Sequence, residues 1–572
     1  MNGLLPLLLI GGAMGVALSE PGVRHPAAKT LSEHAVFEPE MGVAGYMQGV
    51  VAELRQDPAA AKRGYLAALG DDPENVTLRK RALDYALVEG DIDTALRLSK
   101  TLPADEQVFL ARLLRIAEAQ ANGRPDEAEA FLKPLVAQAA KLGVVQGLKA
   151  YIGYSKGQKV EKMVAQWQPH ASAFQDAQRD YHMARLWLKA GDTEQGLKTL
   201  ESAVAQNPSA LVSTQLLLDM YVRAGALTSA TQVQQRFAEV NSGLAPALVW
   251  NESPPPFAST ATEDMAVIMG DFALLLWAEG ALQPAQQMLN IAIWLLEKTQ
   301  KADAADINLN IFYRSVVQEK LGNLADAEAG YQRVAAHAPG GLALVAQVRA
   351  AEVAYQRGQH KQALSDVKVL ARQNPEQLMV QQSLAQMAHA EEQFPLAVEA
   401  YTRILAAIPV SQTERRAVIL YGRGSAYERL RKGAEAEQDL LASLRLNPAN
   451  PQALNYLGYM WVDQNKNLGA AYVLLKRAHL LAPNDGAITD SVGWAYFRKG
   501  DYKTAVAYLE RAAEQEPGTP EILDHLADTY AQLGNVAEAK KLWKRALDLA
   551  AQGAIVPSPN LVPAIRKKLN QY

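Results

Sequence analysis

A 34-residue spacing of small and apolar residues limits what this 572-residue chain can fold into more than any other feature. In Ser491–Gly518, apolar and small residues recur about one helical turn apart on both sides of Gly500. This pattern predicts two amphipathic helices joined by a tight turn. Gly493 and Ala505 fall where the helices would cross, and larger side chains there would widen the usual axis separation of about 8–10 Å. Pro517 then ends the second helix.

The same pattern recurs along most of the chain. Three further copies flank the first one in register, at Gly424–Pro448, Leu457–Pro483 and Leu526–Ala546, the second of these with one extra residue in the turn. Weaker copies extend back toward residue 45, and their turn glycines are Gly90, Gly123, Gly191, Gly225, Gly280, Gly322 and Gly358. So many copies in series predict stacked helical hairpins, each buried against its neighbours.

Period, residue order and closing proline together resemble the tetratricopeptide repeat family. The resemblance covers roughly residues 45 to 550, is most specific in the last four copies, and weakens before about residue 170. It implies an all-α fold, a right-handed superhelix of about a dozen helix-turn-helix repeats, in which the first helix of each repeat lines a concave groove.

Composition shifts suggest where this array begins, breaks and ends. The uncharged run Leu4–Leu18 is similar to a secretory signal peptide cleaved after Ser19, although no Lys or Arg precedes it, and a retained N-terminal helix is the alternative. The run is shorter than the about 20 residues that span a membrane. Three prolines in Asn251–Asp264 interrupt the helices. We therefore expect a signal peptide (1–19), a linker (20–44), an N-terminal degenerate array (45–250), a Pro-rich break (251–264), a C-terminal array (265–551) and a C-terminal capping segment (552–572).

Charge and cysteine content exclude several functions. Lys and Arg number 57 against 61 Asp and Glu, so no basic field for nucleic acid is expected. Cysteine is absent, which excludes disulfides, thiolate metal sites and lipid attachment through cysteine. We expect protein or peptide partners, no cofactor and no metal; association with the periphery of a membrane is compatible with these features.

No motif predicts catalysis. Gly153–Gly157 matches the G-x-S-x-G pattern of serine hydrolases, but its flanks look helical where that motif needs a strand before it, so Ser155 is interpreted as a turn residue. His182 and His525 each lack a second ligand four residues away and are interpreted as surface or packing histidines. Asp524 and Asp528 share a helical face, yet an open groove offers little of the desolvation that acid–base chemistry needs.

The resemblance implies which residues line the groove, through four fixed positions around the small residue of each first helix. These candidate partner-binding residues are Asn455, Tyr459, Asp490, Trp494, Phe497, Arg498, Asp524 and Asp528. They are aromatic and acidic, which favours a partner with basic or aromatic groups. The Lys and Asn that hold a carboxylate in chaperone-binding family members are absent from these positions. The alternative is that Trp494 and Phe497 only pack against the next repeat.

Two functional hypotheses follow. The chain is similar to tetratricopeptide lipoproteins of the bacterial outer membrane that act as adaptors for a periplasmic carboxyl-terminal-processing protease, although it has no cysteine near Ser19. This similarity implies a non-catalytic scaffold in the periplasm or at the outer-membrane periphery. The alternative is a cytoplasmic assembly factor. An enzyme would need an unrecognised site within about residues 103–180, where only Ser155 draws attention.

Overall fold

The computed structural model describes residues 41–55, 57–103, 105–167, 172–299, 304–552 and 560–572. In these residues the chain forms twenty-nine α-helices and one short 3₁₀ helix, without a strand, as the all-α expectation requires. The predicted signal peptide and nearly all of the predicted linker lie outside the described residues. None of the helices described combines the length and the apolarity needed to cross a membrane.

Two compact units, described separately here, divide between Asp366 and Val367. The N-terminal unit contains α1 (Met41–Leu54), α2 (Pro58–Asp71), α3 (Val76–Glu89), α4 (Ile92–Thr101), α5 (Phe109–Ala121), α6 (Pro125–Ala139), α7 (Gly143–Ser155), α8 (Val160–Ala165), α9 (Ala173–Lys189), α10 (Thr193–Gln206), α11 (Leu211–Arg223), α12 (Leu227–Val240), η1 (Ala245–Ala247), α13 (Ala261–Ala278), α14 (Leu282–Lys298), α15 (Ala304–Lys320), α16 (Leu324–His337) and α17 (Gly341–Gln356).

The division falls within α18 (His360–Gln373). The C-terminal unit continues with α19 (Leu378–Ala390), α20 (Phe394–Ala407), α21 (Thr413–Arg429), α22 (Gly433–Leu446), α23 (Pro451–Asp463), α24 (Leu468–Leu481), α25 (Gly486–Arg498), α26 (Tyr502–Gln515), α27 (Pro520–Gln532), α28 (Val536–Gln552) and α29 (Leu561–Gln571).

The hairpin of α25 and α26 shows how the repeat sequence produces its structure. The Asp485 side chain caps α25 by accepting a hydrogen bond of 3.0 Å from the backbone N–H of Ile488. Gly500 follows α25 with φ +85°, the left-handed conformation that ends a helix at lowest cost in glycine. Asp501 then caps α26 through the backbone N–H of Thr504 at 3.2 Å. Local sequence therefore fixes both helix starts and the turn between them.

Within each of three successive hairpins, a glycine of the first helix packs on a leucine of the second helix. A Cβ on Gly493 would lie 2.6 Å from Cγ of Leu509, and one on Gly458 would lie 2.7 Å from Cγ of Leu475. The third pair, Gly424 on Leu440, would leave 3.1 Å. All three leucines are buried, and full burial of such a side chain stabilises a fold by about 1.5–3 kcal/mol. The predicted role of the small residues, to bring the helices together, thus holds at these crossings.

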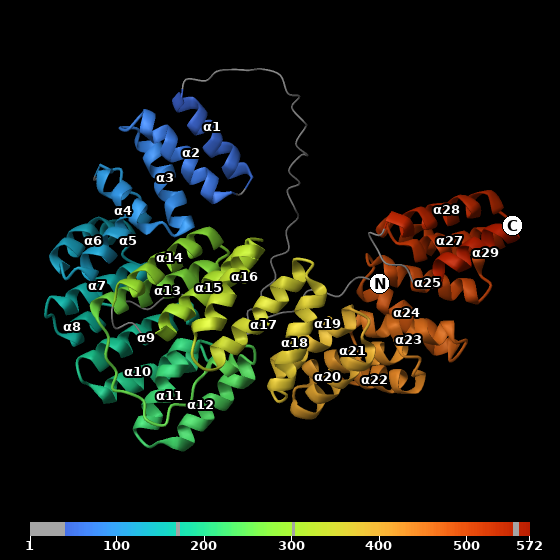
Figure 1. The fold of residues 1–572 in the computed structure, drawn as a ribbon. Helices are drawn as coiled ribbons and strands as arrows, with labels where there is room; N and C mark the ends of the chain where they lie inside the picture. The colour runs from blue at the N-terminus through green and yellow to red at the C-terminus, as the bar shows by residue number, and fades with distance from the viewer. Residues whose placement is uncertain (1–40, 56, 104, 168–171, 300–303, 553–559) are drawn as a thin grey trace. The chain divides into compact units, whose positions relative to one another are not determined.

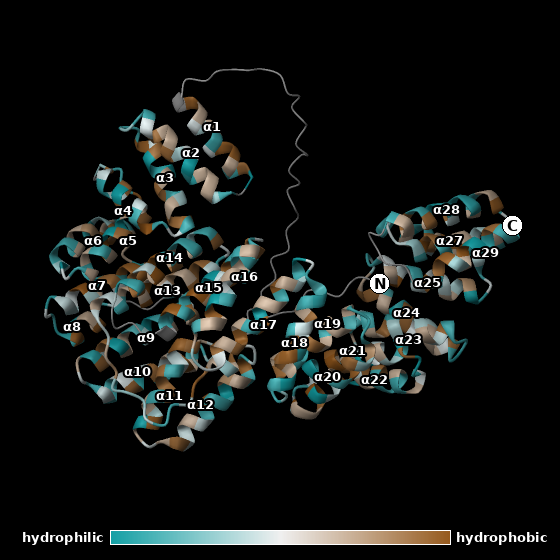
Figure 2. Ribbon diagram, viewed as in Figure 1, coloured by the Kyte–Doolittle hydropathy of each residue, from teal (hydrophilic) through white to brown (hydrophobic). Residues whose placement is uncertain are grey.

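The N-terminal unit folds back on itself after the proline-rich segment. Helices α13 and α14 pack against α3, α5 and α7, which precede them by more than a hundred residues, and the residues concerned form one continuous apolar core. Figure 1 shows α13 to α15 in the middle of this unit, with α3 to α12 around them. Figure 2 shows that the helices of the unit carry both hydrophobic and hydrophilic residues. Helices α3, α5 and α7 are therefore covered by helices that come later in the chain.

Polar side chains of α14 form hydrogen bonds with backbone carbonyl groups in the C-terminal part of α3. The last carbonyl groups of a helix have no partner within the helix. The Asn290 side-chain amide donates to the backbone O of Leu87 at 2.8 Å, and the Gln286 amide donates to the backbone O of Val88 at 3.0 Å. Gln287 in turn donates to the backbone O of Asp84 at 3.1 Å. These contacts fix the position of α14 relative to α3 as well as burying it.

The compact units divide at a different place from the break that the prolines suggested. We expected Asn251–Asp264 to separate an N-terminal from a C-terminal array; in the structure α13 and α14, beyond this segment, belong to the N-terminal unit. The physical reason lies in α14, in which Ala285–Ile293 is buried on every side. Its apolar side chains join the core of the earlier helices, and its buried Gln286 and Asn290 amides are paired with carbonyl groups of α3. The proline-rich segment is therefore a connection within one unit and not a boundary between two units.

We predict that Gly493→Ala lowers the free energy of unfolding by about 1–3 kcal/mol, because the new methyl group overpacks the contact with Leu509. Gly469→Ala in α24 is the matched control, since a Cβ there would meet no atom within 4 Å. It should be neutral or slightly stabilising. Chemical denaturation followed by circular dichroism measures both variants. Equal stability of the two would contradict the close-approach account.

Candidate partner-binding surface

The first helices of four successive hairpins form one continuous face in the C-terminal unit. We call it the first-helix face; it is formed by α21, α23, α25 and α27. Helix α23 packs on α25, and α25 packs on α27. The ring of Tyr421 on α21 lies 6.1 Å from that of Tyr456 on α23, and the Tyr456 hydroxyl donates to Glu428 at 3.0 Å. All eight predicted partner-binding residues belong to three of these helices.

Trp494 and Phe497 form part of an aromatic stack across this face. The Trp494 ring is stacked on Phe497 at 4.6 Å between centroids and on His525 of the next hairpin at 4.2 Å. Phe497 also contacts Tyr502 of its own hairpin at 5.3 Å. Trp494 therefore does pack against the next repeat, as the alternative to partner binding expects, and Phe497 packs on Trp494. Trp494 is only half-buried, so part of its ring is still accessible on the first-helix face.

The Asp490 side chain is paired with a histidine of the neighbouring first helix. Its carboxylate lies 2.9 Å from Nδ1 of His525 on α27, and the two side chains are largely buried. Burial alone would lower the pKa of His525, but the negative charge of Asp490, with its hydrogen bond, outweighs burial and raises that pKa. Asp524 and Asp528 act in the same direction. The pair therefore joins α25 to α27 most strongly when the imidazole carries a proton.

Asp524 and Asp528 are bound by the last helix of the chain. Lys568 of α29 donates to both carboxylates, at 2.8 and 2.7 Å, and Nε1 of Trp543 donates to Asp528 at 3.2 Å. The apolar side chains Leu561 and Ile565 of α29 pack in the same core as Trp543. The charge of Lys568 offsets the repulsion between the two carboxylates. These aspartates hold the end of the array together, which leaves them a smaller part in binding a partner than the groove positions alone imply.

Tyr459 is the predicted residue whose hydroxyl lies near acidic groups from several helices. It is half-buried on α23, and burial raises the pKa of its hydroxyl, with Asp490, Asp463, Glu428 and Glu521 adding to the effect. These four carboxylates come from all four helices of the first-helix face. A neutral hydroxyl surrounded by negative charge favours a partner that brings hydrogen-bond donors or positive charge.

Three further polar groups complete the surface. Among the described residues, Oδ1 of Asn455 and Nε1 of Trp494 are shielded from water without a hydrogen-bond partner. Such unsatisfied groups are costly, and a ligand that pairs them gains by it. Arg498 is exposed and lies 3.7 Å from Asp463, so it lies at the rim of the acidic patch.

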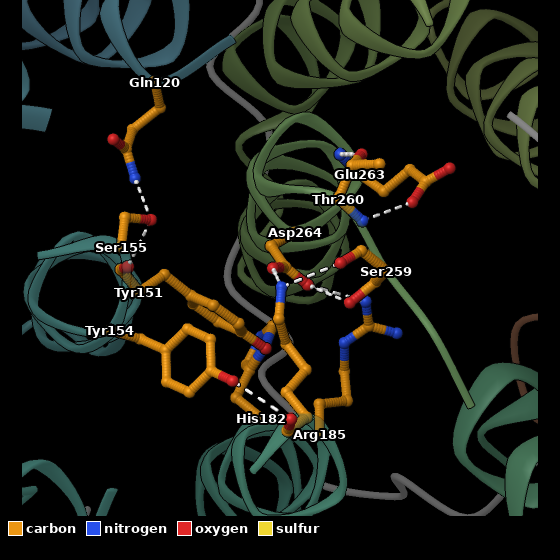
Figure 3. Close-up of polar contacts among 11 residues, drawn as sticks. Gln120, Tyr151, Tyr154, Ser155, His182, Arg185, Ser259, Thr260, Glu263 and Asp264 are labelled. Atoms are coloured by element: carbon orange, nitrogen blue, oxygen red, sulfur yellow. Dashed lines mark hydrogen bonds and ion pairs between the residues drawn. The ribbon is translucent and has the colours of Figure 1, made fainter. Parts of the chain in front are cut away.

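The serine of the G-x-S-x-G pattern lies in a helical setting. Ser155 is the last residue of α7, and its hydroxyl donates to the backbone O of Tyr151 at 3.0 Å and accepts from Gln120 at 3.2 Å (Figure 3). The serine thus sits at a helix end and not in a strand-to-helix turn. This setting supplies none of the local geometry that the hydrolase motif requires.

His182 is a buried packing residue. Its Nδ1 lies 3.3 Å from the hydroxyl of Tyr151, its Nε2 lies 3.1 Å from Asp271, and its ring is stacked on Trp167. A small cavity of about 30 Å³ lies beside it, lined partly by Phe272. Within the ranges that the structure describes, no three His, Asp or Glu side chains gather in a way that would hold a metal ion.

Another polar cluster, in the N-terminal unit, was missed by the sequence analysis. Arg185 of α9 contacts Asp264 at 3.0 Å, Lys189 forms an ion pair with the same carboxylate, and the Ser259 hydroxyl donates to it at 2.8 Å. Figure 3 shows Ser259 and Asp264 facing Arg185. The fixed positions used for α23, α25 and α27, applied also to α9, would have selected Arg185 and Lys189.

Comparison with known proteins agrees with this architecture. Two sequence profiles, both described as tetratricopeptide repeat, match residues 421–483 and 496–555. The TPR repeat-containing protein PA4667 of Pseudomonas aeruginosa is 37% identical over 110 residues, which make up 19% of this chain and 18% of that relative. The aligned part of the chain thus spans less than a fifth of the curated relative.

Two solved structures match part of the chain. A tetratricopeptide repeat protein from Parabacteroides merdae is 16% identical and covers 46% of this chain and 97% of its own, with a TM-score of 0.38. YrrB, described as a TPR protein with an unusual peptide-binding site, is 21% identical and covers 35% of this chain and 97% of its own, with a TM-score of 0.26. The matched profiles, together with the helical hairpins, show that the chain contains tetratricopeptide repeats within residues 421–483 and 496–555. Repeats of this family indicate a protein-interaction scaffold.

We predict that the contact between Asp490 and His525 stabilises the C-terminal unit below the unfolded histidine pKa of about 6.5, and that this contribution is lost as pH rises through the raised folded value. His525→Gln should therefore cost about 1–2 kcal/mol near pH 6 and less near pH 9. Denaturation of both proteins at the two pH values measures this. The exposed His337 provides the control His337→Gln, and an equal cost of His525→Gln at both pH values would contradict the assignment.

Proposed function

We propose that this protein is a non-catalytic scaffold that holds a protein or peptide partner against the first-helix face of its C-terminal unit. The observation that carries the proposal is Tyr459, half-buried among carboxylates from four helices. Beside it, Asn455 and Trp494 each present a polar atom that has no partner among the described residues. A bound peptide would cover the half-buried aromatic surface of Tyr459 and Trp494.

Charge selects the class of partner. Glu428, Asp463, Asp490 and Glu521 surround Tyr459, and Arg498 lies at the rim. A basic peptide with an aromatic residue meets complementary charge here, whereas a free C-terminal carboxylate meets like charge. This arrangement disfavours the chaperone-tail recognition of some family members.

We further propose that the scaffold works in the bacterial cell envelope as an adaptor that brings cell-wall hydrolases to a periplasmic processing protease. The signal-like run Leu4–Leu18 and the resemblance to envelope adaptors support this location. Because this sequence contains no cysteine, lipid attachment through cysteine is excluded, and we propose peripheral membrane contact. The alternative function is a cytoplasmic assembly factor, in which the run Leu4–Leu18 is retained.

Groove variants test the binding surface. We predict that Tyr459→Ala and Trp494→Ala each weaken binding of a basic, aromatic peptide by about 1–2 kcal/mol. Tyr459→Ala removes the hydroxyl that lies near the carboxylates. Trp494→Ala removes the ring surface and the indole N–H donor. Fluorescence anisotropy with labelled peptides, one basic and one with Glu in place of each basic residue, measures the affinities.

The matched control for these variants is Leu480→Ala, because Leu480 on α24 is 81% exposed and lies off the first-helix face. It should leave affinity unchanged. Tyr459→Ala with unaltered affinity would remove the proposed surface. A collapsed thermal transition in Trp494→Ala would assign that ring to packing alone.

Mass determination of the native N-terminus tests the proposed location. We expect the purified native chain to begin at Glu20 and to co-fractionate with the cell envelope, and the chain from Glu20 to Tyr572 to enrich a processing protease or cell-wall hydrolases. Retention of Met1 in a cytosolic fraction would contradict export and favour the assembly factor.

A further inference from the structure

An extended segment of the chain crosses two first helices of the N-terminal unit. Residues 249–259 connect η1 to α13 and contain the three consecutive prolines. The segment contacts α11 near its start and α9 near its end, so it spans two neighbouring repeats. It is the only part of the chain described here that we find bound across first helices as an extended peptide.

Gln215 of α11 binds the start of the segment through both ends of its amide. Its Nε2 donates to the backbone O of Val249 at 2.8 Å, and its Oε1 accepts from the backbone N–H of Val249 at 2.8 Å. A side-chain amide that pairs with both backbone groups of one residue recognises extended chain independently of the side chain there. Asp219 accepts from the same amide at 2.9 Å and orients it.

Helix α9 binds the end of the segment. The guanidinium group of Arg185 lies over the ring of Phe257, 5.1 Å from its centroid. Lys189 donates to the backbone O of Ser259 at 2.9 Å. Both cations are also paired with Asp264, so their positions are fixed before the segment is bound. This half of the site thus accepts an aromatic side chain and a backbone carbonyl.

These contacts come from the positions that define the groove in the C-terminal unit. Each first helix is followed by a residue of positive φ, Gly191 after α9, Gly225 after α11 and Asn465 after α23. Counted back from that residue, Gln215 corresponds to Asn455, Arg185 to Tyr459 and Lys189 to Asp463. The segment therefore lies where a partner would lie in an open groove.

We propose that α9 and α11 form a second peptide-binding site, for an extended, proline-containing segment with an aromatic residue, and that residues 249–259 are its internal occupant. The site is masked in the resting chain and opens when an external segment of the same chemistry displaces the internal one. It differs from the C-terminal groove in charge, since it presents Arg185 and Lys189 where that groove presents Tyr459 and Asp463.

The exposure and the composition of residues 249–259 allow an external segment to displace them. Asn251–Ser253, Pro255, Pro256 and Ala258 are exposed, whereas Pro254 is buried. A mostly exposed segment with few anchoring contacts opens at low cost. Its prolines keep it extended without backbone donors that need partners. An internal occupant still competes at high effective concentration, so an external peptide binds the intact chain weakly.

A labelled peptide with the sequence of residues 247–260 tests the proposal on the full-length protein by fluorescence anisotropy. Phe257→Ala weakens the internal occupant and leaves every groove residue in place, so the peptide should bind this variant at least about ten-fold more tightly than the intact chain. Val249→Pro, which deletes the internal donor to Gln215, should give a gain of the same kind. The second variant keeps the test valid if the first alters the fold.

Adding Gln215→Ala to Phe257→Ala should abolish the gain. The matched control Gln235→Ala, at an exposed position of α12, should retain it. Tyr459→Ala should not change this binding, which separates it from the C-terminal groove. No gain in either release variant, or a gain that survives Gln215→Ala, would overturn the proposal.

Discussion

The structure depends on one steric condition, that the two helices of a hairpin approach closely at a small residue. Gly493, Gly458 and Gly424 each receive a leucine from the partner helix at distances that leave no room for a Cβ without movement. Once that contact is made, the remaining apolar face of the hairpin can be buried only by the next hairpin. Stacking, the continuous row of first helices, and the side chains that project from that row all follow from this condition.

The two units use their first helices in different ways. In the C-terminal unit, contacts such as Asp490 with His525 and Lys568 with Asp524 connect successive helices and leave Tyr459 within an acidic surface. In the N-terminal unit, α13 and α14 pack against α3, α5 and α7, and residues 249–259 cross α9 and α11. We propose that the first unit binds a partner on this acidic surface, whereas the second encloses a segment of its own chain.

The regular features could be predicted from sequence because they are local. Glycine and proline positions mark the turns, and the spacing of Gly493 and Ala505 requires two crossing helices. The return of α14 to α3 is a contact between residues about two hundred positions apart, and no local pattern encodes it. The stretch Ala285–Ile293 contains Gln286, Gln287 and Asn290, so from sequence it has the polar positions of an ordinary surface helix, although all of it is buried. The groove positions selected Tyr459 from the sequence, but they could not reveal that Lys568 binds Asp524 and Asp528.

The most direct test of this account is hydrogen exchange of the full-length protein with and without a saturating basic, aromatic peptide. If the C-terminal unit carries the open groove, protection increases in α21, α23, α25 and α27, while α9, α11 and residues 249–259 keep the exchange of the free chain. Protection confined to the N-terminal unit, or spread over second helices such as α24 and α26, would contradict the assignment of the partner surface to the first-helix face.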